Sequence, residues 1–343
     1  MLDSSICVFI IQIIKKARFV ISLIAFAILK MRKIIILIII SFAYGFSYAQ
    51  SEAANWYFGY NSGIKFNQTN NTVSSASNGK LNTHEGCTTI SDDSGNLLFY
   101  TDGITVWNKS HAIMSNGTGL YGDPSSTQSA IIVPKPNTPN IYYIFTVDNH
   151  TSTQTHLGLN YSEVDMTLSG GFGAVTTKNV NLLQECSEKV TAVLKDCITS
   201  SIWVLGLASQ AGDLDTYDTF HSFEVSESGV SPFSIKSTFD IEIIDKRGYL
   251  KLSPDGYKMA CANANNGLYL YDFNSSTGKV SNQLKLGISG TSDKPYGLEF
   301  SPSGQLLYIH SSNDFFDEEN PINNEEPTNH NSLLVQFNLA APN

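Results

Sequence analysis

Short apolar runs alternate with polar turn residues along most of this chain. After residue 50, aromatic and β-branched residues gather in runs of a few residues, and Gly, Pro, Asn, Asp or Ser bounds each run. Such spacing is typical of β-strands joined by tight connections. No amphipathic helical stretch of convincing length stands out, and residues 180–193 form the only weak helical candidate. The pattern therefore predicts an all-β domain.

One unit, a polar turn followed by an apolar strand, recurs five times. The clearest copies are residues 252–262 (LSPDGYKMACA) and 300–310 (FSPSGQLLYIH), and residues 90–100 (ISDDSGNLLFY) share their outline. Looser copies occupy residues 133–145 and 194–205. The aligned strands start at Leu97, Ile141, Ile202, Lys258 and Leu306, at intervals of 44 to 61 residues. A four-stranded propeller blade has a period of about 40–50 residues, so the repeat predicts a β-propeller with extended loops in the two longest intervals.

The number of repeats sets the expected number of blades. An N-terminal strand pair is expected at residues 55–59 and 63–66, and outer strands at residues 220–225, 267–273 and 333–339. Five repeats and the N-terminal pair predict five to six blades. A propeller protects its edges by joining its last blade to its first, and no closing repeat follows here. We therefore expect a C-terminally incomplete propeller that is seven-bladed in the full protein.

A secretory signal peptide is expected over residues 31–49. Met31-Arg32-Lys33 is followed by a short apolar run and by small residues at Ser47 and Ala49, the pattern of a signal peptide cleaved after Ala49. Residues 1–30 carry a second hydrophobic run, which we interpret as a mis-annotated start or an extra hydrophobic segment. The alternative for that run is an uncleaved membrane hairpin.

The propeller domain is then expected to cover residues 50–343 of a secreted or cell-surface protein. Contact with a membrane is expected only through export, or through residues 1–40 if they are retained. Removing residues 1–49 takes away six basic side chains and one acidic one, which changes the formal net charge from −10 to −15. Such a surface repels nucleic acid and anionic lipid, so neither is expected as a partner.

The cysteines of the propeller region do not form a zinc-binding pattern, because no C-x-x-C or Cys/His pair occurs. Export permits a disulfide, and Cys186–Cys197 is the best candidate because the two are close in sequence. Cys87 and Cys261 are about equally well explained as small buried strand residues. The three tryptophans, Trp56, Trp107 and Trp203, fall on expected strands, where packing between blades explains them better than a sugar-binding platform.

Part of the chain resembles a known family. The resemblance lies in residues 85–103 (EGCTTISDDSGNLLFYTDG), 106–108 (VWN), 117–120 (GTGL), 125–129 (SSTQS) and 294–304 (KPYGLEFSPSG). These segments are similar to the N-terminal WD40/YVTN-like propeller of large secreted surface proteins of gliding bacteria. Proteins of that family commonly carry PKD domains and a C-terminal sorting domain for type IX secretion. The resemblance implies a cell-surface protein and supplies no catalytic residues.

Two acidic loops are weak candidates for calcium binding. One contains Asp213, Asp215 and Asp218, and the other contains Asp314, Asp317 and Glu318. Clustered carboxylates are hard oxygen ligands, but the full EF-hand spacing is missing, so solvated loops are the alternative for both. The histidines are scattered without metal-ligand spacing, and no Gly-x-Ser-x-Gly elbow is present.

We therefore expect a binding or scaffold module of a larger adhesin-like surface protein, without catalysis, that contacts a protein or polysaccharide ligand. The alternative is a propeller enzyme of the lactonase or quinoprotein-like type with a metal in its central channel. Carboxylates or histidines that converge on the channel axis would favour this alternative. A further alternative is a non-functional truncated fragment.

Overall fold

The computed structural model describes residues 51–67, 69–149, 157–214, 216–288, 293–313 and 316–340. The expected signal peptide and the segment before it lie outside the described residues. In the described part the chain is built from β-strands, and its helices are short 3-10 turns: η1 (Ser51–Ala53), η2 (Pro321–Glu325) and η3 (Pro327–Asn329). None of the helices in these residues has the length and apolar character needed to cross a membrane.

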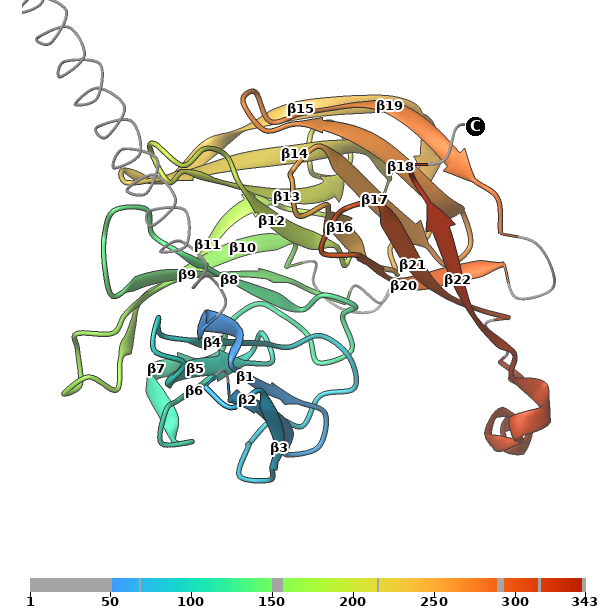
Figure 1. The fold of residues 1–343 in the computed structure, drawn as a ribbon. Coiled ribbons are helices and arrows are strands. Elements are labelled where there is room, and N and C mark those ends of the chain that lie inside the picture. The colour runs from blue at the N-terminus through green and yellow to red at the C-terminus, as the bar shows by residue number, and fades with distance from the viewer. Residues whose placement is uncertain are drawn as a thin grey trace, which may run out of the picture. The chain divides into compact units, whose positions relative to one another are not determined.

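The described chain begins with a three-stranded antiparallel sheet (Figure 1). Its strands are β1 (Asn55–Phe58), β2 (Ser62–Asn67) and β3 (Thr72–Ala76), in the order β1-β2-β3. β1 and β2 are the strand pair that the sequence predicted. β1 also contacts β4, the first strand of the next sheet, so this sheet packs against the remainder of the fold.

The next eight strands form one continuous sheet made of two four-stranded blades. The first blade contains β4 (Thr88–Ser91), β5 (Leu97–Thr101), β6 (Thr105–Asn108) and β7 (Ile113–Thr118). The second contains β8 (Ala130–Pro134), β9 (Ile141–Val147), β10 (Leu159–Asp165) and β11 (Ala174–Leu183). Their outermost strands, β7 and β11, meet in a short parallel pairing at Ser115 and Ala174, and this pairing joins the two blades into one sheet.

Two more four-stranded blades and a three-stranded sheet complete the described chain. The third blade contains β12 (Val190–Leu194), β13 (Ile202–Ala208), β14 (Tyr217–Ser226) and β15 (Gly229–Ile243). The fourth contains β16 (Leu250–Leu252), β17 (Lys258–Asn263), β18 (Gly267–Asn274) and β19 (Lys279–Leu286). The last sheet contains β20 (Lys294–Phe300), β21 (Leu306–Ser312) and β22 (Ser332–Asn338).

These sheets confirm the predicted propeller. Each of the five turn-and-strand units connects the first strand of a sheet to its second. The predicted strand starts are the first residues of β5, β9, β13, β17 and β21, namely Leu97, Ile141, Ile202, Lys258 and Leu306. With the N-terminal sheet, six blades or partial blades lie in the described residues, within the expected range of five to six. The seven-bladed full ring stays a prediction.

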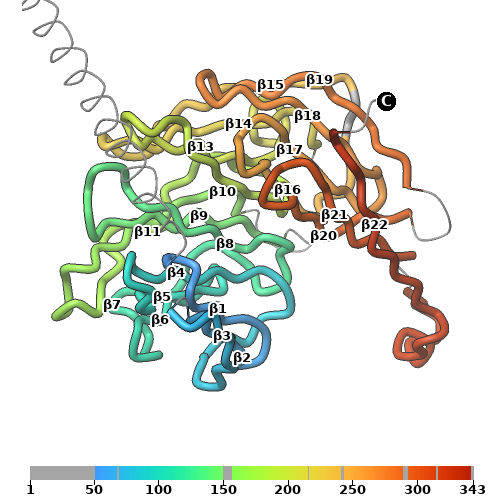
Figure 2. Tube along the Cα trace, in the orientation of Figure 1, coloured from blue at the N-terminus to red at the C-terminus, as the bar shows by residue number. Residues whose placement is uncertain are grey.

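The first strands of neighbouring blades lie side by side around a central axis. β4 contacts β8, β8 contacts β12, β12 contacts β16, and β16 contacts β20, and Figure 2 follows the chain through these blades in order. Apolar side chains fill the spaces between successive sheets. Phe145 of β9 and Phe223 of β14, for example, belong to one buried cluster between the second and third blades. The first strands therefore enclose the channel of the propeller, and their ends define its mouths.

Two sequence-based expectations about local structure are wrong. Residues 180–193 are not helical, because they contain the end of β11 and the start of β12. Trp56 does not pack between blades: it is 50% exposed and makes an edge-on contact with Phe66 of the neighbouring strand. Trp107 and Trp203 do pack between sheets as expected. Trp107 packs against the cluster of Tyr57, Leu81 and Tyr100 between the N-terminal sheet and the first blade, and Trp203 packs against the turn of the following blade. The expected loop at residues 151–155 lies outside the described residues.

Candidate functional site at the channel mouth

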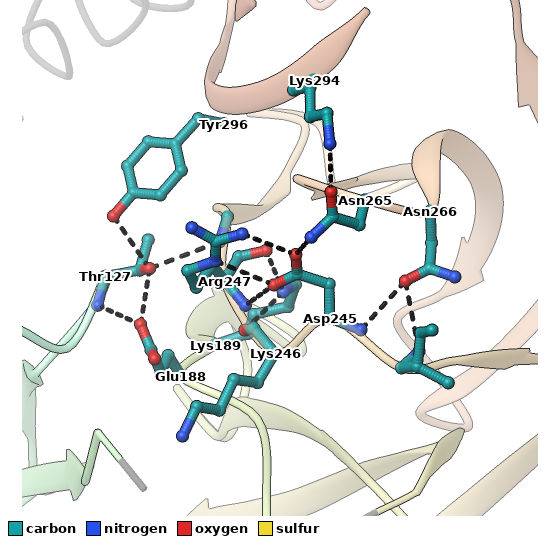
Figure 3. Close-up of polar contacts among 12 residues, drawn as sticks. Thr127, Glu188, Lys189, Asp245, Lys246, Arg247, Asn265, Asn266, Lys294 and Tyr296 are labelled. Carbon is teal, nitrogen blue, oxygen red and sulfur yellow. Dashed lines mark hydrogen bonds and ion pairs between the residues drawn. The ribbon is translucent and has the colours of Figure 1, made fainter. Parts of the chain in front are cut away.

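Five polar side chains meet where the first strands of the blades begin. Four lie two or three residues ahead of a first strand and the fifth lies within one: Glu85 before β4, Thr127 before β8, Glu188 before β12, Arg247 before β16 and Tyr296 in β20. We call them the channel-mouth site, and Figure 3 shows all of them except Glu85. Because the first strands surround the axis, their leading ends bring one side chain from each of these five sheets to the same end of the axis.

The buried base of the site is a pair formed by Thr127 and Glu188. Glu188 is 2% exposed. Its Oε2 accepts hydrogen bonds from the backbone N of Thr127 at 2.9 Å and from Thr127 Oγ1 at 2.8 Å. Two donors on one oxygen hold this carboxylate in a single position and compensate part of the cost of burying its charge. The pair ties the second blade to the third.

Tyr296 connects this base to Glu85, which is exposed to solvent. Tyr296 Oη donates to Glu85 Oε2 at 2.7 Å and lies 3.0 Å from Thr127 Oγ1. Desolvation raises the pKa of Glu85, and the negative charge of Glu188 raises it further. The hydrogen bond from Tyr296 and the positive charge of Arg247 oppose this shift. The result is an accessible carboxyl group with a higher affinity for protons than an ordinary glutamate.

The Arg247 side chain is held in place by the carboxylate of Asp245. Its Nε and Nη2 donate to the two oxygens of Asp245, at 3.1 and 2.9 Å. Asn265 Nδ2 donates to the same carboxylate at 2.6 Å, and Lys294 donates in turn to Asn265 Oδ1. Burial works to raise the pKa of Asp245, but the hydrogen bonds and charge of Arg247 hold it below its ordinary value. This fork fixes the guanidinium plane at the mouth (Figure 3).

A fully buried lysine supports the loop that carries Arg247. Lys189 Nζ donates to the backbone carbonyls of Lys246 and Arg247 at 2.7 and 2.8 Å. Burial lowers the pKa of Lys189. An ammonium group in this position costs desolvation energy and is retained here because it satisfies two carbonyl oxygens that face the interior. Lys189 therefore positions Arg247 without reaching the opening itself.

Two glycines let the channel-mouth residues approach the neighbouring strands. Gly86 follows Glu85, and a Cβ at that position would lie 2.1 Å from the backbone N of Ser129. Gly248 follows Arg247 with φ +108°, and a Cβ there would lie 2.4 Å from the carbonyl O of Ala262. Only glycine fits at these close contacts, because any Cβ would clash with the neighbouring backbone. The glycine directly after each charged residue therefore allows the chain to place that residue at the channel mouth.

The predicted calcium ligands do not gather around a cation site. Among the described residues, no group of three or more His, Cys, Asp or Glu side chains is arranged to hold a metal ion. Asp213 and Glu318 are exposed, and Asp218 accepts a hydrogen bond from Thr219 Oγ1 at 2.7 Å. Asp215 and Asp314 lie outside the described residues. The channel-mouth site contains two carboxylates, Glu85 and Glu188, and a metal-binding group would need at least three such side chains.

Asp317 has a local structural role. Its carboxylate accepts hydrogen bonds from the backbone N of Glu319 at 3.0 Å, the backbone N of Asn320 at 2.8 Å and Asn323 Nδ2 at 2.7 Å. The bond from Asn323 is the main reason that the pKa of Asp317 lies below its ordinary value. N–H donors already occupy both carboxylate oxygens, so this side chain holds together the loop that leads into the short helix η2.

The structure does not join Cys186 to Cys197. Both are free: Cys186 is buried in the core ahead of β12, whereas Cys197 is exposed in the turn after β12. The extended strand between them separates the two thiols, which sequence proximity alone did not reveal. Cys87 and Cys261 are free as well, and Cys261 is buried as expected of a small strand residue.

The pKa of Glu85 tests this electrostatic arrangement. Glu188→Gln is expected to lower it, because the substitution removes a negative charge that raises it. Arg247→Gln is expected to raise it, because the lost positive charge favoured the carboxylate. Carboxyl-carbon NMR titration of the labelled protein measures both shifts, with Glu227→Gln in the exposed β14–β15 turn as the charge-matched control. Unchanged titration in both channel-mouth variants would show that these side chains do not share a site.

Sequence reasoning missed the channel-mouth residues, although the repeat contained a signal for them. Glu85 lies six residues before Ser91, and Arg247 lies six residues before Ser253, the first residue of the turn in each repeat. Reading the repeats upstream of their turns would have aligned these two side chains with each other, but not with Glu188, which lies seven residues before Lys195. No periodicity marks Tyr296, which is contributed from a strand.

Comparison with known proteins adds distant likenesses. No protein-family model matches the chain, and no curated protein does. A candidate 6-phosphogluconolactonase from Bacteroides uniformis is 14% identical, with 72% of this chain and 69% of that one covered at a TM-score of 0.38. Another from Bacteroides fragilis is 11% identical, with 76% and 74% covered at 0.40. A candidate exo-β-1,3-galactanase from Bifidobacterium bifidum is 11% identical, with 85% and 87% covered at 0.39. Structural similarity at these TM-scores does not indicate a substrate for this chain.

The expectation of a binding or scaffold module without catalysis is corrected here. The three solved structures named above bear the names of two lactonases and a galactanase, and none of the three bears the name of a scaffold. Two carboxylates also come together at the channel mouth, a feature expected to favour the lactonase-type alternative, although they do not form a metal-binding group among the described residues. Glu85 and Glu188 converge there and are linked through Tyr296 and Thr127.

Proposed function

We propose that the channel-mouth site hydrolyses a small lactone or a related carboxylic ester. The observation that carries this proposal is the exposed Glu85 carboxyl, with its raised pKa and its hydrogen bond to Tyr296. A carboxylate with increased proton affinity is a better general base than an ordinary glutamate. Arg247 supplies a fixed positive charge close enough to act on Glu85, and such a charge stabilises a developing oxyanion.

Each residue has a role in the proposed reaction. Glu85 takes a proton from a water molecule, whose oxygen forms a bond to the carbonyl carbon of the ester. Arg247 stabilises the negative charge that develops on the carbonyl oxygen. The C–O bond to the alcohol oxygen then breaks, and Glu85 returns its proton to that oxygen, so the products are a carboxylic acid and a hydroxyl group. Tyr296 positions Glu85 and does not exchange a proton.

The burial of Glu188 favours ester hydrolysis over cleavage of a glycosidic bond. Glycoside hydrolases commonly use two carboxyl groups that both reach the substrate. In the channel-mouth site Glu85 is the exposed carboxyl group of the two. Glu188 is 2% exposed, and both donors of Thr127 engage its Oε2. One accessible base beside one guanidinium is sufficient for attack of water on an ester carbonyl.

Hydrolysis of a panel of lactones tests the proposal. With glucono-δ-lactone and two γ-lactones, acid release measured in a pH-stat is expected to exceed the uncatalysed rate. Glu85→Gln is expected to lower kcat/KM by about 10²–10⁴-fold, because it removes the general base. Glu227→Gln, an equal change of charge in an exposed turn, is expected to leave the rate unchanged. Absence of acceleration with every lactone, or equal rates for Glu85→Gln and the wild type, would contradict the proposal.

We also propose that the chain is exported and belongs with the surface propellers of gliding bacteria that carry PKD and type IX sorting domains. The basic start and apolar run of residues 31–49, with the motifs in residues 85–103, support this proposal. N-terminal sequencing of protein from the culture medium or cell surface is expected to begin at Gln50. Recovery of the protein only from the cytoplasm would refute export.

A further inference from the structure

A second pocket lies between the N-terminal sheet and the first blade. Its volume is about 610 Å³, and its walls come from β1, β2, β3 and the residues after it, the start of β5 and the turn between β6 and β7. This volume is within the range of small-molecule sites. It shares no lining residue with the channel-mouth site. We propose that this pocket binds an acidic saccharide, independently of the function proposed for the channel mouth.

Tyr57 lines the pocket, and a stack of aromatic rings supports it from the interior. The rings of Tyr57 and Tyr100 stack with centroids 4.8 Å apart, and Trp107 stacks on Tyr100 at 5.6 Å. A Cβ on Gly79 would lie 2.7 Å from the Tyr57 ring, and one on Gly63 would lie 2.9 Å from it. The glycines therefore let the backbone close around this ring and fix the position of its hydroxyl group.

A chain of hydrogen bonds extends from that hydroxyl group along the pocket. Tyr57 Oη donates to Asn78 Oδ1 at 3.0 Å, and Asn78 Nδ2 lies 2.7 Å from His111 Nε2. Since the amide nitrogen can only donate, Nε2 accepts and carries no proton. His111 Nδ1 lies 3.0 Å from Tyr100 Oη, and burial lowers the pKa of His111. The imidazole is thus a neutral, fixed part of the wall.

His111 adopts an unusual backbone conformation to reach this position. Its φ is +60°, in the left-handed region that a residue with a side chain rarely enters. Such strain persists where the surroundings determine the conformation, and it is enriched at binding sites. Here the two ring nitrogens are bound to Asn78 and Tyr100. These contacts place the imidazole in the pocket lining.

The charge of the pocket indicates an anionic ligand. Lys65 and Lys109 line it, and no Asp or Glu does so among the described residues. This contrasts with the chain as a whole, whose formal net charge is −10. Lys109 also lies 5.3 Å from the ring centroid of Phe172. The charge of Lys109 also acts on the nearby Asp92, whose carboxylate accepts hydrogen bonds from the amides of Ser94 and Asn96. Lys65 is the lysine of the lining for which no such contact is found in the described part of the chain.

The neutral polar groups of the lining favour a saccharide over a simple anion. Asn55, Asn78 and Asn96 contribute amides, and Ser74, Ser75 and Ser77 contribute hydroxyl groups. The hydroxyl groups can donate and accept, and the amides present acceptor oxygens, because each of the three amide nitrogens already donates to a group of the protein. This combination matches the many hydroxyl groups of a sugar. Asn55 is itself fixed by bonds to Ser91 Oγ and to the carbonyl O of Gly95, at 2.9 and 3.0 Å. A disaccharide that bears a carboxylate or sulfate fits these chemical groups.

Calorimetric titration of the protein with four probes tests the assignment. Digalacturonate and a sulfated chondroitin disaccharide supply acidic saccharides, galactobiose is the neutral match, and sodium sulfate is the bare anion. At least one acidic disaccharide is expected to bind, with galactobiose and sulfate about tenfold weaker or worse. Lys65→Gln and Lys109→Gln are each expected to weaken binding about tenfold through the loss of a charged hydrogen bond.

Two control variants separate this proposal from that for the channel mouth. Glu85→Gln and Glu227→Gln are expected to bind the acidic disaccharide with unchanged affinity. The proposal is overturned if neither acidic disaccharide binds, if sulfate or galactobiose binds equally well, or if both lysine variants retain full affinity. Circular dichroism of the lysine variants, which are changed at exposed side chains, verifies that they fold.

Discussion

Gly248→Ala is expected to lower the free energy of unfolding by about 3–5 kcal/mol, through backbone strain together with overpacking. Gly248 has φ +108°, and a new Cβ would lie 2.4 Å from the carbonyl O of Ala262. That oxygen belongs to strand β17 of the fourth blade, so it cannot move without disturbing the sheet. Equilibrium denaturation with urea measures the effect as a shift of the midpoint at constant slope.

Two other glycines separate the causes of this loss. Gly170 has φ +67° but nothing lies within 4 Å of its missing Cβ, and Gly287 has open space without a positive φ. Gly170→Ala is expected to cost about 1–2 kcal/mol from backbone conformation alone. Gly287→Ala is expected to have almost no effect. If Gly248→Ala lowers the free energy of unfolding no more than Gly170→Ala does, the loop of Arg247 does not approach β17 as closely as described.

Trp203→Ala is expected to lower the free energy of unfolding by about 3–5 kcal/mol, as for other large buried aromatic residues. Trp203 is 4% exposed. Its Nε1 donates to the carbonyl O of Ser275 at 2.6 Å, and its ring packs against Gly278. Both contacts lie in the β18–β19 turn of the next blade. The substitution therefore removes a hydrogen bond and a packed ring from the interface between the third and fourth blades.

Trp56→Ala provides the matched comparison. Trp56 is 50% exposed, and its ring meets Phe66 edge-on at 5.2 Å. Its loss is expected to cost about 1 kcal/mol or less, as for most surface substitutions. Denaturation of both variants under the same conditions measures the difference. Equal costs for the two tryptophans would mean that contacts between blades contribute little to the stability of this propeller.

The arrangement of strands could be predicted well from the sequence, because it rests on local chemistry. In Ser253-Pro-Asp-Gly, Asp255 accepts from the backbone N of Tyr257 and Gly256 supplies φ +73°. Such a turn forms from local interactions and does not depend on the residues that surround it in the fold. Each repeat contains such a turn followed by an apolar strand, so the positions of the second strands were predicted to the residue. The number of blades followed from counting the turns.

The functional residues could not be predicted in the same way, because they come together only in the folded ring. Glu85 and Tyr296 share a hydrogen bond across 211 residues, and Thr127 and Tyr296 are 169 residues apart. The acidic loops were more conspicuous in the sequence, yet the carboxylate of Asp317 accepts hydrogen bonds from within its own loop. Clustering along the chain is a poor guide to clustering in space where adjacent residues belong to loops.

The sequence by itself determined that this chain forms antiparallel blades, where each blade turns and about how many blades there are. Turn chemistry and strand periodicity act between neighbouring residues, so they can be read along the chain. Only the tertiary structure decided which side chains meet at the channel mouth, which tryptophan is buried, and that Cys186 and Cys197 stay apart. The first two outcomes depend on how the sheets assemble around the axis, which joins side chains that are distant in the sequence. The two cysteines stay apart because β12 runs extended between them.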